Sequence, residues 1–153
     1  MTTSNNVYIS REFSCSKSRL FKWLVEPGLI TKWFGPKNLT VKNVQSYLKV
    51  NGTYSVELLK PDGTFFYICG TYLEIEAPDK LKFSFGYSGL DRPPPESIVE
   101  ITLKEINQTL TELSLIQRFE TIPSDIDNRT KSWESMFEKL SEELRIVTKG
   151  GHN

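Results

Sequence analysis

A small set of polar side chains occupies positions from which it could perform chemistry inside the folded chain. Alternation with apolar neighbours puts Arg11, Tyr54 and Gln117 on faces that we expect to point inward. Tyr72 follows the same pattern less clearly, because Gly70 lies just before it. A guanidinium can bind an acidic or phenolic group, and a phenol or an amide can polarise a carbonyl or guide a proton. Any reaction in the interior would have to be built from these groups.

The residue types that form nucleophilic or metal centres are sparse. The one histidine, His152, lies near the end of the sequence, and Cys15 and Cys69 have no metal-ligand spacing. No Ser/His/Asp or Cys/His arrangement can be assembled from this set. We therefore predict no catalytic residue, no metal and no cofactor, and the residues favour a binding protein over an enzyme. Both cysteines are expected to be buried free thiols in a reducing compartment.

Arg11 has two interpretations. It shares one face of the segment 7–14 with apolar residues, so its guanidinium could anchor an acidic or phenolic ligand. Alternatively it lies at an edge, with its aliphatic stem packed and its head paired to Glu138 or Glu142. The sequence leaves both readings open.

Aromatic residues are abundant, with three Trp, six Tyr and nine Phe in 153 residues. Aromatic rings line pockets for flat apolar ligands, but they also fill ordinary cores. We expect several of them to converge between the helices and the sheet. The predicted ligand-binding residues are Arg11, Trp33, Phe34, Tyr54, Tyr72, Phe83, Phe85, Trp133 and Phe137.

Period-two alternation predicts strands, and steps of three and four predict helices. In chain order we predict a strand at 7–14, short helices at 17–25 and 29–33, strands at 41–46, 53–59, 64–75, 80–87, 97–105 and 109–121, and a long helix at 124–147. Ser16 is the expected N-cap of the first helix. Asn51-Gly52 is a hairpin signal typical of a type I′ turn, and Gly70 predicts a bulge or bend.

The long C-terminal helix carries the largest apolar stripe. Its members are Trp133, Met136, Phe137, Leu140, Leu144 and Val147. Because such a stripe must be buried, we predict an α+β fold in which a curved antiparallel sheet of six to seven strands wraps around this helix. Residues 7–147 form the single predicted domain, with a disordered N-terminus at 1–6, a flexible tail at 148–153 and a proline-rich loop at 88–96.

Charge and hydropathy narrow the range of partners. The 19 Lys and Arg balance the 19 Asp and Glu, which offers no field for nucleic acid. No apolar run is long enough to cross a membrane, and the first residues lack a signal-peptide pattern. We expect a cytoplasmic protein that is a monomer or a weak homodimer, with Tyr8 and Tyr67 on outer faces.

Short motifs in a fixed order resemble the START-like or SRPBCC superfamily and its helix-grip fold. They are REF at 11–13, ITKWFGP at 30–36, NGTY at 51–54, GTYLEI at 70–75, PDKL at 78–81 and Trp133 at the start of the last helix. Within the superfamily, the chain is most similar to the family of the C-terminal domain of the activator of heat-shock protein 90 ATPase. Asn51 replaces the first of two glycines that are usual in that family.

This resemblance implies that a small apolar molecule binds between the sheet and the long helix. It also implies two alternatives. One is a co-chaperone-like interaction domain that contacts the chaperone, and the other is a polyketide cyclase-like enzyme.

Overall fold

A computed structural model of the chain describes residues 6–35, 38–88, 97–121 and 123–149. The elements are β1 (Asn6–Phe13), α1 (Lys17–Val25), α2 (Pro27–Trp33), β2 (Thr40–Ser46), β3 (Thr53–Leu59), β4 (Phe65–Glu76), β5 (Lys80–Ser88), β6 (Ser97–Asn107), β7 (Leu110–Phe119) and α3 (Ile126–Lys149). Their order and type match the predicted succession of one strand, two short helices, six strands and one long helix.

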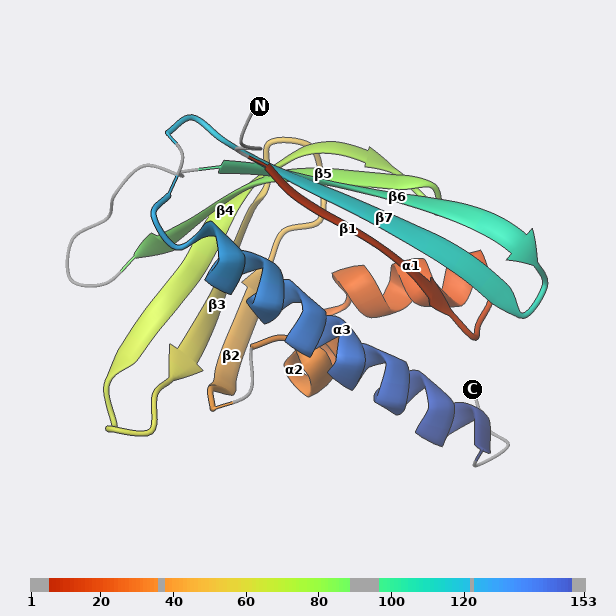
Figure 1. The fold of residues 1–153 in the computed structure, drawn as a ribbon, viewed down its shortest axis with the longest axis horizontal. Helices are drawn as coiled ribbons and strands as arrows, with labels where there is room; N and C mark the ends of the chain where they lie inside the picture. Colours follow the sequence, from red (N-terminus) through yellow and green to blue (C-terminus); the bar gives the residue numbers. More distant parts are fainter. Residues whose placement is uncertain (1–5, 36–37, 89–96, 122, 150–153) are drawn as a thin grey trace.

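The strands form one seven-stranded sheet in the order β1-β7-β6-β5-β4-β3-β2, and every neighbouring pair is antiparallel. Strands β2 to β7 therefore pair with their sequence neighbours, as short connections favour. The sheet curves around α3, and α1 and α2 lie on the same concave side (Figure 1). This arrangement confirms the predicted helix-grip fold.

The two short helices are separated by Glu26. Ser16 caps α1 as predicted, because its Oγ accepts a hydrogen bond from the Arg19 backbone N–H at 3.2 Å. Helix α2 begins at Pro27, two residues before the predicted start at 29, because a proline at the first helical position loses no hydrogen bond. The indole Nε1 of Trp33 donates to the carbonyl of Trp23 at 3.0 Å, which ties the two helices together.

The connection between β2 and β3 has the predicted bounds, but its turn is not the type I′ turn that Asn51-Gly52 indicated. It spans residues 47–52, and Gly52 N donates to Lys49 O at 2.8 Å. Asn51 has a φ of 72°, so it occupies the third position of a four-residue turn, as in a type II turn. The type I′ prediction was wrong because the left-handed conformation of Asn51 suits either turn. A Cβ on Gly52 would lie 2.0 Å from the carbonyl oxygen of Tyr47, which explains the glycine there.

Gly70 lies where β4 and β5 approach closely. A Cβ at this position would come within 1.9 Å of the Ser84 carbonyl oxygen. The pairing between the strands is interrupted from Cys69 to Tyr72, as the glycine predicted, and the register shift of a bulge follows between Tyr72 and Glu74. The Ser84 carbonyl beside Gly70 accepts a hydrogen bond from the Tyr54 side chain instead.

The ends of the regular elements extend slightly beyond the predicted domain. Asn6 belongs to β1, and α3 continues to Lys149. The other residues of the predicted ends, and the proline-rich segment 89–96, lie outside the described residues.

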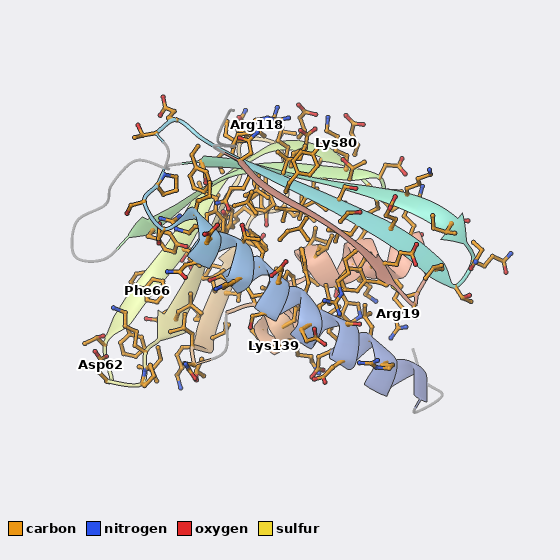
Figure 2. The ribbon with its side chains drawn as sticks, viewed as in Figure 1. Arg19, Asp62, Phe66, Lys80, Arg118 and Lys139 are labelled. Atoms are coloured by element: carbon orange, nitrogen blue, oxygen red, sulfur yellow. The ribbon has the colours of Figure 1, made fainter. Side chains whose placement is uncertain are left out.

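The convex face of the sheet is lined with charges (Figure 2). Lys80 binds Glu74 and Glu100 at 3.0 Å each, and Arg118 binds Glu100 at 3.2 Å. The neighbouring Leu81 points to the opposite face and is buried. The alternation predicted for these strands thus separates a polar outer face from an apolar inner one.

Cys15 and Cys69 do not form a disulfide. Cys15 is buried, and its burial raises the pKa of the thiol to about 11 against a smaller lowering effect of Arg19. Cys69 is only half-buried, which differs from the prediction of two buried thiols. No helix in the described part of the chain is long and apolar enough to span a membrane.

Candidate functional site

An inner chamber lies between the sheet and the three helices, with a volume of about 50 Å³. Its walls are almost entirely apolar and come from every layer of the fold. They are formed by Leu24, Ile30, Trp33, Phe34, Tyr54, Val56, Tyr72, Leu81, Phe83, Phe85, Ile101 and Trp133. The list includes Trp33, Phe34, Tyr54, Tyr72, Phe83, Phe85 and Trp133, so most of the predicted aromatic residues do meet around one space.

The rings of the inner chamber contact one another in edge-to-face and tilted pairs. The Tyr54 ring lies 5.5 Å from both Tyr72 and Phe83, and Phe34 lies 6.2 Å from Trp133. These centroid distances are those of favourable aromatic pairs. The volume of about 50 Å³ has room for only a few water molecules, so the inner chamber alone is too small for a ligand.

Two predicted site residues lie elsewhere. Arg11 is on the inward face of β1, but β1 is an edge strand, and the guanidinium pairs with Glu138 at 3.5 Å instead of entering the chamber. Phe137 is fully buried against Phe13 and Trp33. It lies one helical turn after Trp133 and fills the core next to the chamber. Neither side chain lines the inner chamber.

The two tyrosines are the polar groups of the inner chamber. Tyr54 Oη donates to the Ser84 carbonyl at 2.7 Å, and Tyr72 Oη shares a hydrogen bond of 2.6 Å with Ser46 Oγ. Burial raises the pKa of Tyr54 well above its usual range, and burial also raises that of Tyr72 against the opposing effect of Ser46. Both phenols are therefore neutral at physiological pH and cannot act as bases there.

The raised pKa of Tyr54 predicts a specific loss of stability in alkali. The folded chain holds the phenolic proton more tightly than the unfolded chain, so this stabilisation is complete below about pH 10 and is lost as the pH rises above it. In urea unfolding between pH 8 and 11.5, the free energy of unfolding should fall less steeply with pH for Tyr54→Phe than for the wild type. Tyr8→Phe, at a position 69% exposed, is the control and should decline like the wild type. Equal slopes for all three proteins would contradict the prediction.

A second, outer chamber of about 120 Å³ adjoins the inner one. It is lined by Leu39, Phe66, Ile68, Phe85, Tyr87, Gln117, Arg129, Ser132, Trp133 and Met136. Phe85 and Trp133 line both chambers, and their ring centroids are 5.6 Å apart. These two rings therefore form the partition between the chambers.

A chain of buried hydrogen bonds fixes the partition. Trp133 Nε1 donates to Gln117 Oε1 at 2.9 Å, Gln117 Nε2 donates to Ser97 Oγ at 2.9 Å, and Ser97 Oγ donates to the Phe85 carbonyl at 3.1 Å. Gln117 is fully buried. Its polar side chain on an otherwise apolar face was visible in the sequence, but its partner on α3 was not.

The segment after α2 is fastened to α3. Lys139 Nζ donates to the Gly35 carbonyl at 2.7 Å, and Gly35 N donates to Met136 Sδ at 3.1 Å. Partial burial lowers the pKa of Lys139. These contacts fix the end of α2, where Trp33 and Phe34 line the inner chamber. Lys139 lies on α3 (Figure 2).

An entrance groove opens from the outer chamber to the surface. It is lined by Lys60, Phe66, Tyr87, Asp125, Asn128, Arg129 and Ser132. Phe66, Tyr87, Arg129 and Ser132 line both the groove and the outer chamber, so the two spaces adjoin. Phe66 marks this end of the molecule, near the first turns of α3 (Figure 2). Sequence reasoning missed the groove because its residues come from three separate segments.

Among the described residues, no group of three His, Cys, Asp or Glu side chains could hold a metal ion. The polar groups at the chambers and the groove include the phenols of Tyr54, Tyr72 and Tyr87, the Ser132 hydroxyl, the Gln117 amide and the charged side chains of the groove.

Comparison with known proteins agrees with this architecture. A family model described as "Activator of Hsp90 ATPase homolog 1-like protein" matches residues 14–145. Among proteins with curated functions, none matches the sequence.

Solved structures with the same fold cover nearly the whole chain. Protein NE0264 from Nitrosomonas europaea is 19% identical with a TM-score of 0.81, over 97% of this chain and 99% of its own. The AHSA1 (SPO3351) protein from Silicibacter pomeroyi is 24% identical with a TM-score of 0.79, over 92% of this chain and 98% of its own. DynU16, described as a putative protein in the dynemicin biosynthetic locus, is 19% identical with a TM-score of 0.73, over 94% of this chain and 48% of its own. At these identities the similarity shows the fold alone.

Proposed function

The chain belongs to the family of Activator of Hsp90 ATPase homolog 1-like proteins, and on that premise we propose that it binds a small hydrophobic or aromatic molecule between the sheet and α3. The observation that carries the proposal is the pair of adjoining chambers with aromatic walls. Helices α1 to α3 and strands β3 to β7 all contribute side chains to these walls. Apolar walls with a few placed polar groups are typical of small-molecule sites.

The size of the chambers limits the ligand. The inner chamber of about 50 Å³ and the outer chamber of about 120 Å³ together exceed the roughly 150 Å³ of an apolar cavity known to bind benzene. They remain well below the roughly 300 Å³ of a drug-sized pocket. A ligand of one ring suits the outer chamber, and a larger one requires Phe85 and Trp133 to move apart.

A thermal-shift screen of single-ring aromatics, fatty acids and flavonoids tests the proposal. A ligand at 100 times its dissociation constant should stabilise the protein by about 2.7 kcal/mol. Ile68→Phe fills the outer chamber and should abolish this stabilisation. Ile9→Phe is the matched control, because Ile9 is also buried on a strand but lines neither chamber. Equal stabilisation of Ile68→Phe and Ile9→Phe by the ligand would contradict the proposal. A screen in which no compound stabilises the wild type would contradict it as well.

The same screen addresses the two alternatives. Conversion of a bound compound into a product would indicate an enzyme, whereas an unchanged compound supports a binding role. The chaperone contact stays a prediction, and stimulation of the Hsp90 ATPase by the full chain would test it.

A further inference from the structure

We propose that the ligand of the outer chamber is a small aromatic carboxylate, with its ring between Phe66 and Trp133 and its carboxylate at Arg129. This inference rests on the proposed function and adds the charge and the orientation of the ligand. It also assigns the entrance groove as the place where the charged end is held.

Arg129 lies at the boundary between the outer chamber and the groove. Its guanidinium carbon is 5.0 Å from the centroid of the Tyr87 ring and 5.5 Å from that of Phe119. Its side chain is only 14% exposed, and its Nε donates to Asp125 Oδ2 at 3.2 Å. Ring contacts and partial burial restrict the guanidinium to one orientation, which lowers the entropy cost of binding an anion.

The charges of the groove favour an anion. Among the described residues that line it, Lys60 and Arg129 are the cations and Asp125 is the carboxylate. Lys60 Nζ lies 5.5 Å from the Phe66 ring centroid, so the second cation also stands over the apolar wall. The Asp125 side chain is 46% exposed, so it can exchange its place beside Arg129 for water when a ligand carboxylate arrives.

The apolar part of the ligand follows from the volume. The outer chamber of about 120 Å³ is somewhat smaller than the roughly 150 Å³ cavity that holds benzene, so one ring fills it after a slight adjustment of its walls. A guanidinium recognises a carboxylate through two parallel hydrogen bonds, which a neutral amide or an ammonium group cannot reproduce. A ring with one carboxylate therefore meets both requirements.

Benzoate, benzamide and benzylamine test this inference, because they share one ring and differ in charge. Isothermal titration of the full chain should show benzoate binding, with benzamide weaker by roughly ten- to hundredfold and benzylamine weaker still. Equal affinities for benzoate and benzamide would overturn the carboxylate inference and leave the proposed function standing. Failure of all three ring compounds to bind, together with a negative ligand screen, would overturn both.

Variants of the groove separate recognition from folding. Arg129→Gln should weaken benzoate binding roughly ten- to hundredfold and leave benzamide binding unchanged, whereas a folding defect would weaken both. Arg145→Gln, at an exposed position on the same helix, is the control. Asp125→Asn keeps a residue suited to the start of a helix and removes the competing carboxylate, so benzoate should bind more tightly. Weaker benzoate binding to Asp125→Asn would contradict the proposed competition.

Discussion

Replacing Phe137 with alanine is expected to lower the free energy of unfolding by about 3–5 kcal/mol. Phe137 is fully buried, and its ring centroid lies 5.8 Å from Phe13, 6.2 Å from Trp33 and 5.7 Å from Trp133. It therefore joins β1, α2 and α3 at one point. Truncation removes the buried ring and leaves a cavity that three separate elements cannot easily close.

Urea unfolding monitored by circular dichroism measures this loss. The matched control is Phe65→Ala, since Phe65 is 49% exposed at the start of β4 and should change stability by less than about 0.5 kcal/mol. A loss below about 1.5 kcal/mol for Phe137→Ala would show that the core around α3 is less tightly packed than the structure indicates.

Replacing Gln117 with leucine is expected to cost about 1–3 kcal/mol, although leucine suits the apolar face of β7. The reason is that the Trp133 indole N–H would lose its hydrogen-bond acceptor, the Gln117 side-chain oxygen at 2.9 Å, in a buried environment. An unsatisfied buried donor is more costly than the gain from one more apolar side chain.

A double-mutant cycle isolates this effect. Trp133→Phe removes the indole N–H that Gln117 satisfies. Gln117→Leu should therefore lower the free energy of unfolding less in the Trp133→Phe background than in the wild type. Strictly additive losses would show that the hydrogen bond does not hold the partition. The same variants should also bind larger aromatic compounds than the wild type, because the ring of residue 133 is no longer fixed between the chambers.

The fold could be predicted because its signals are local. The Ser16 cap, the alternation in β3 and the stripe of α3 each depend on neighbours within one turn or one strand. Proline and glycine marked most boundaries. Their meaning was less certain where one residue fits two geometries, as Pro27 did at the junction of the helices and Asn51 did in the β2–β3 turn.

The inner chamber was also largely predictable, but its limits were not. Strand alternation identifies which side chains face the helix, which is why Tyr54, Phe83 and Phe85 were placed correctly. It does not reveal the position of a strand in the sheet. Arg11 has the inward orientation expected of it, but β1 is at the edge, where Glu138 of α3 can reach the guanidinium.

The outer chamber and the groove depend on contacts between distant segments. Arg129 meets Tyr87 and Phe119 only because β5, β7 and the first turn of α3 end near one another. In the sequence, Arg129 reads as a solvated residue of a helix, and Gln117 as an isolated polar residue. The same limit explains why Phe137 was assigned to the pocket: its helical phase is right, but the chamber ends one turn earlier, at Trp133.

The most direct test of ligand binding between the sheet and α3 is the indole N–H signal of Trp133 in a two-dimensional NMR titration with benzoate. Trp133 stands on the partition and Trp33 lines the inner chamber, whereas Trp23 lies away from both chambers beside a surface groove of α1. The Trp133 signal should shift in a saturable way, while the Trp23 signal stays in place. A titration that moves no indole signal, or that moves the Trp23 signal as much as the Trp133 signal, would contradict a ligand site between the sheet and α3.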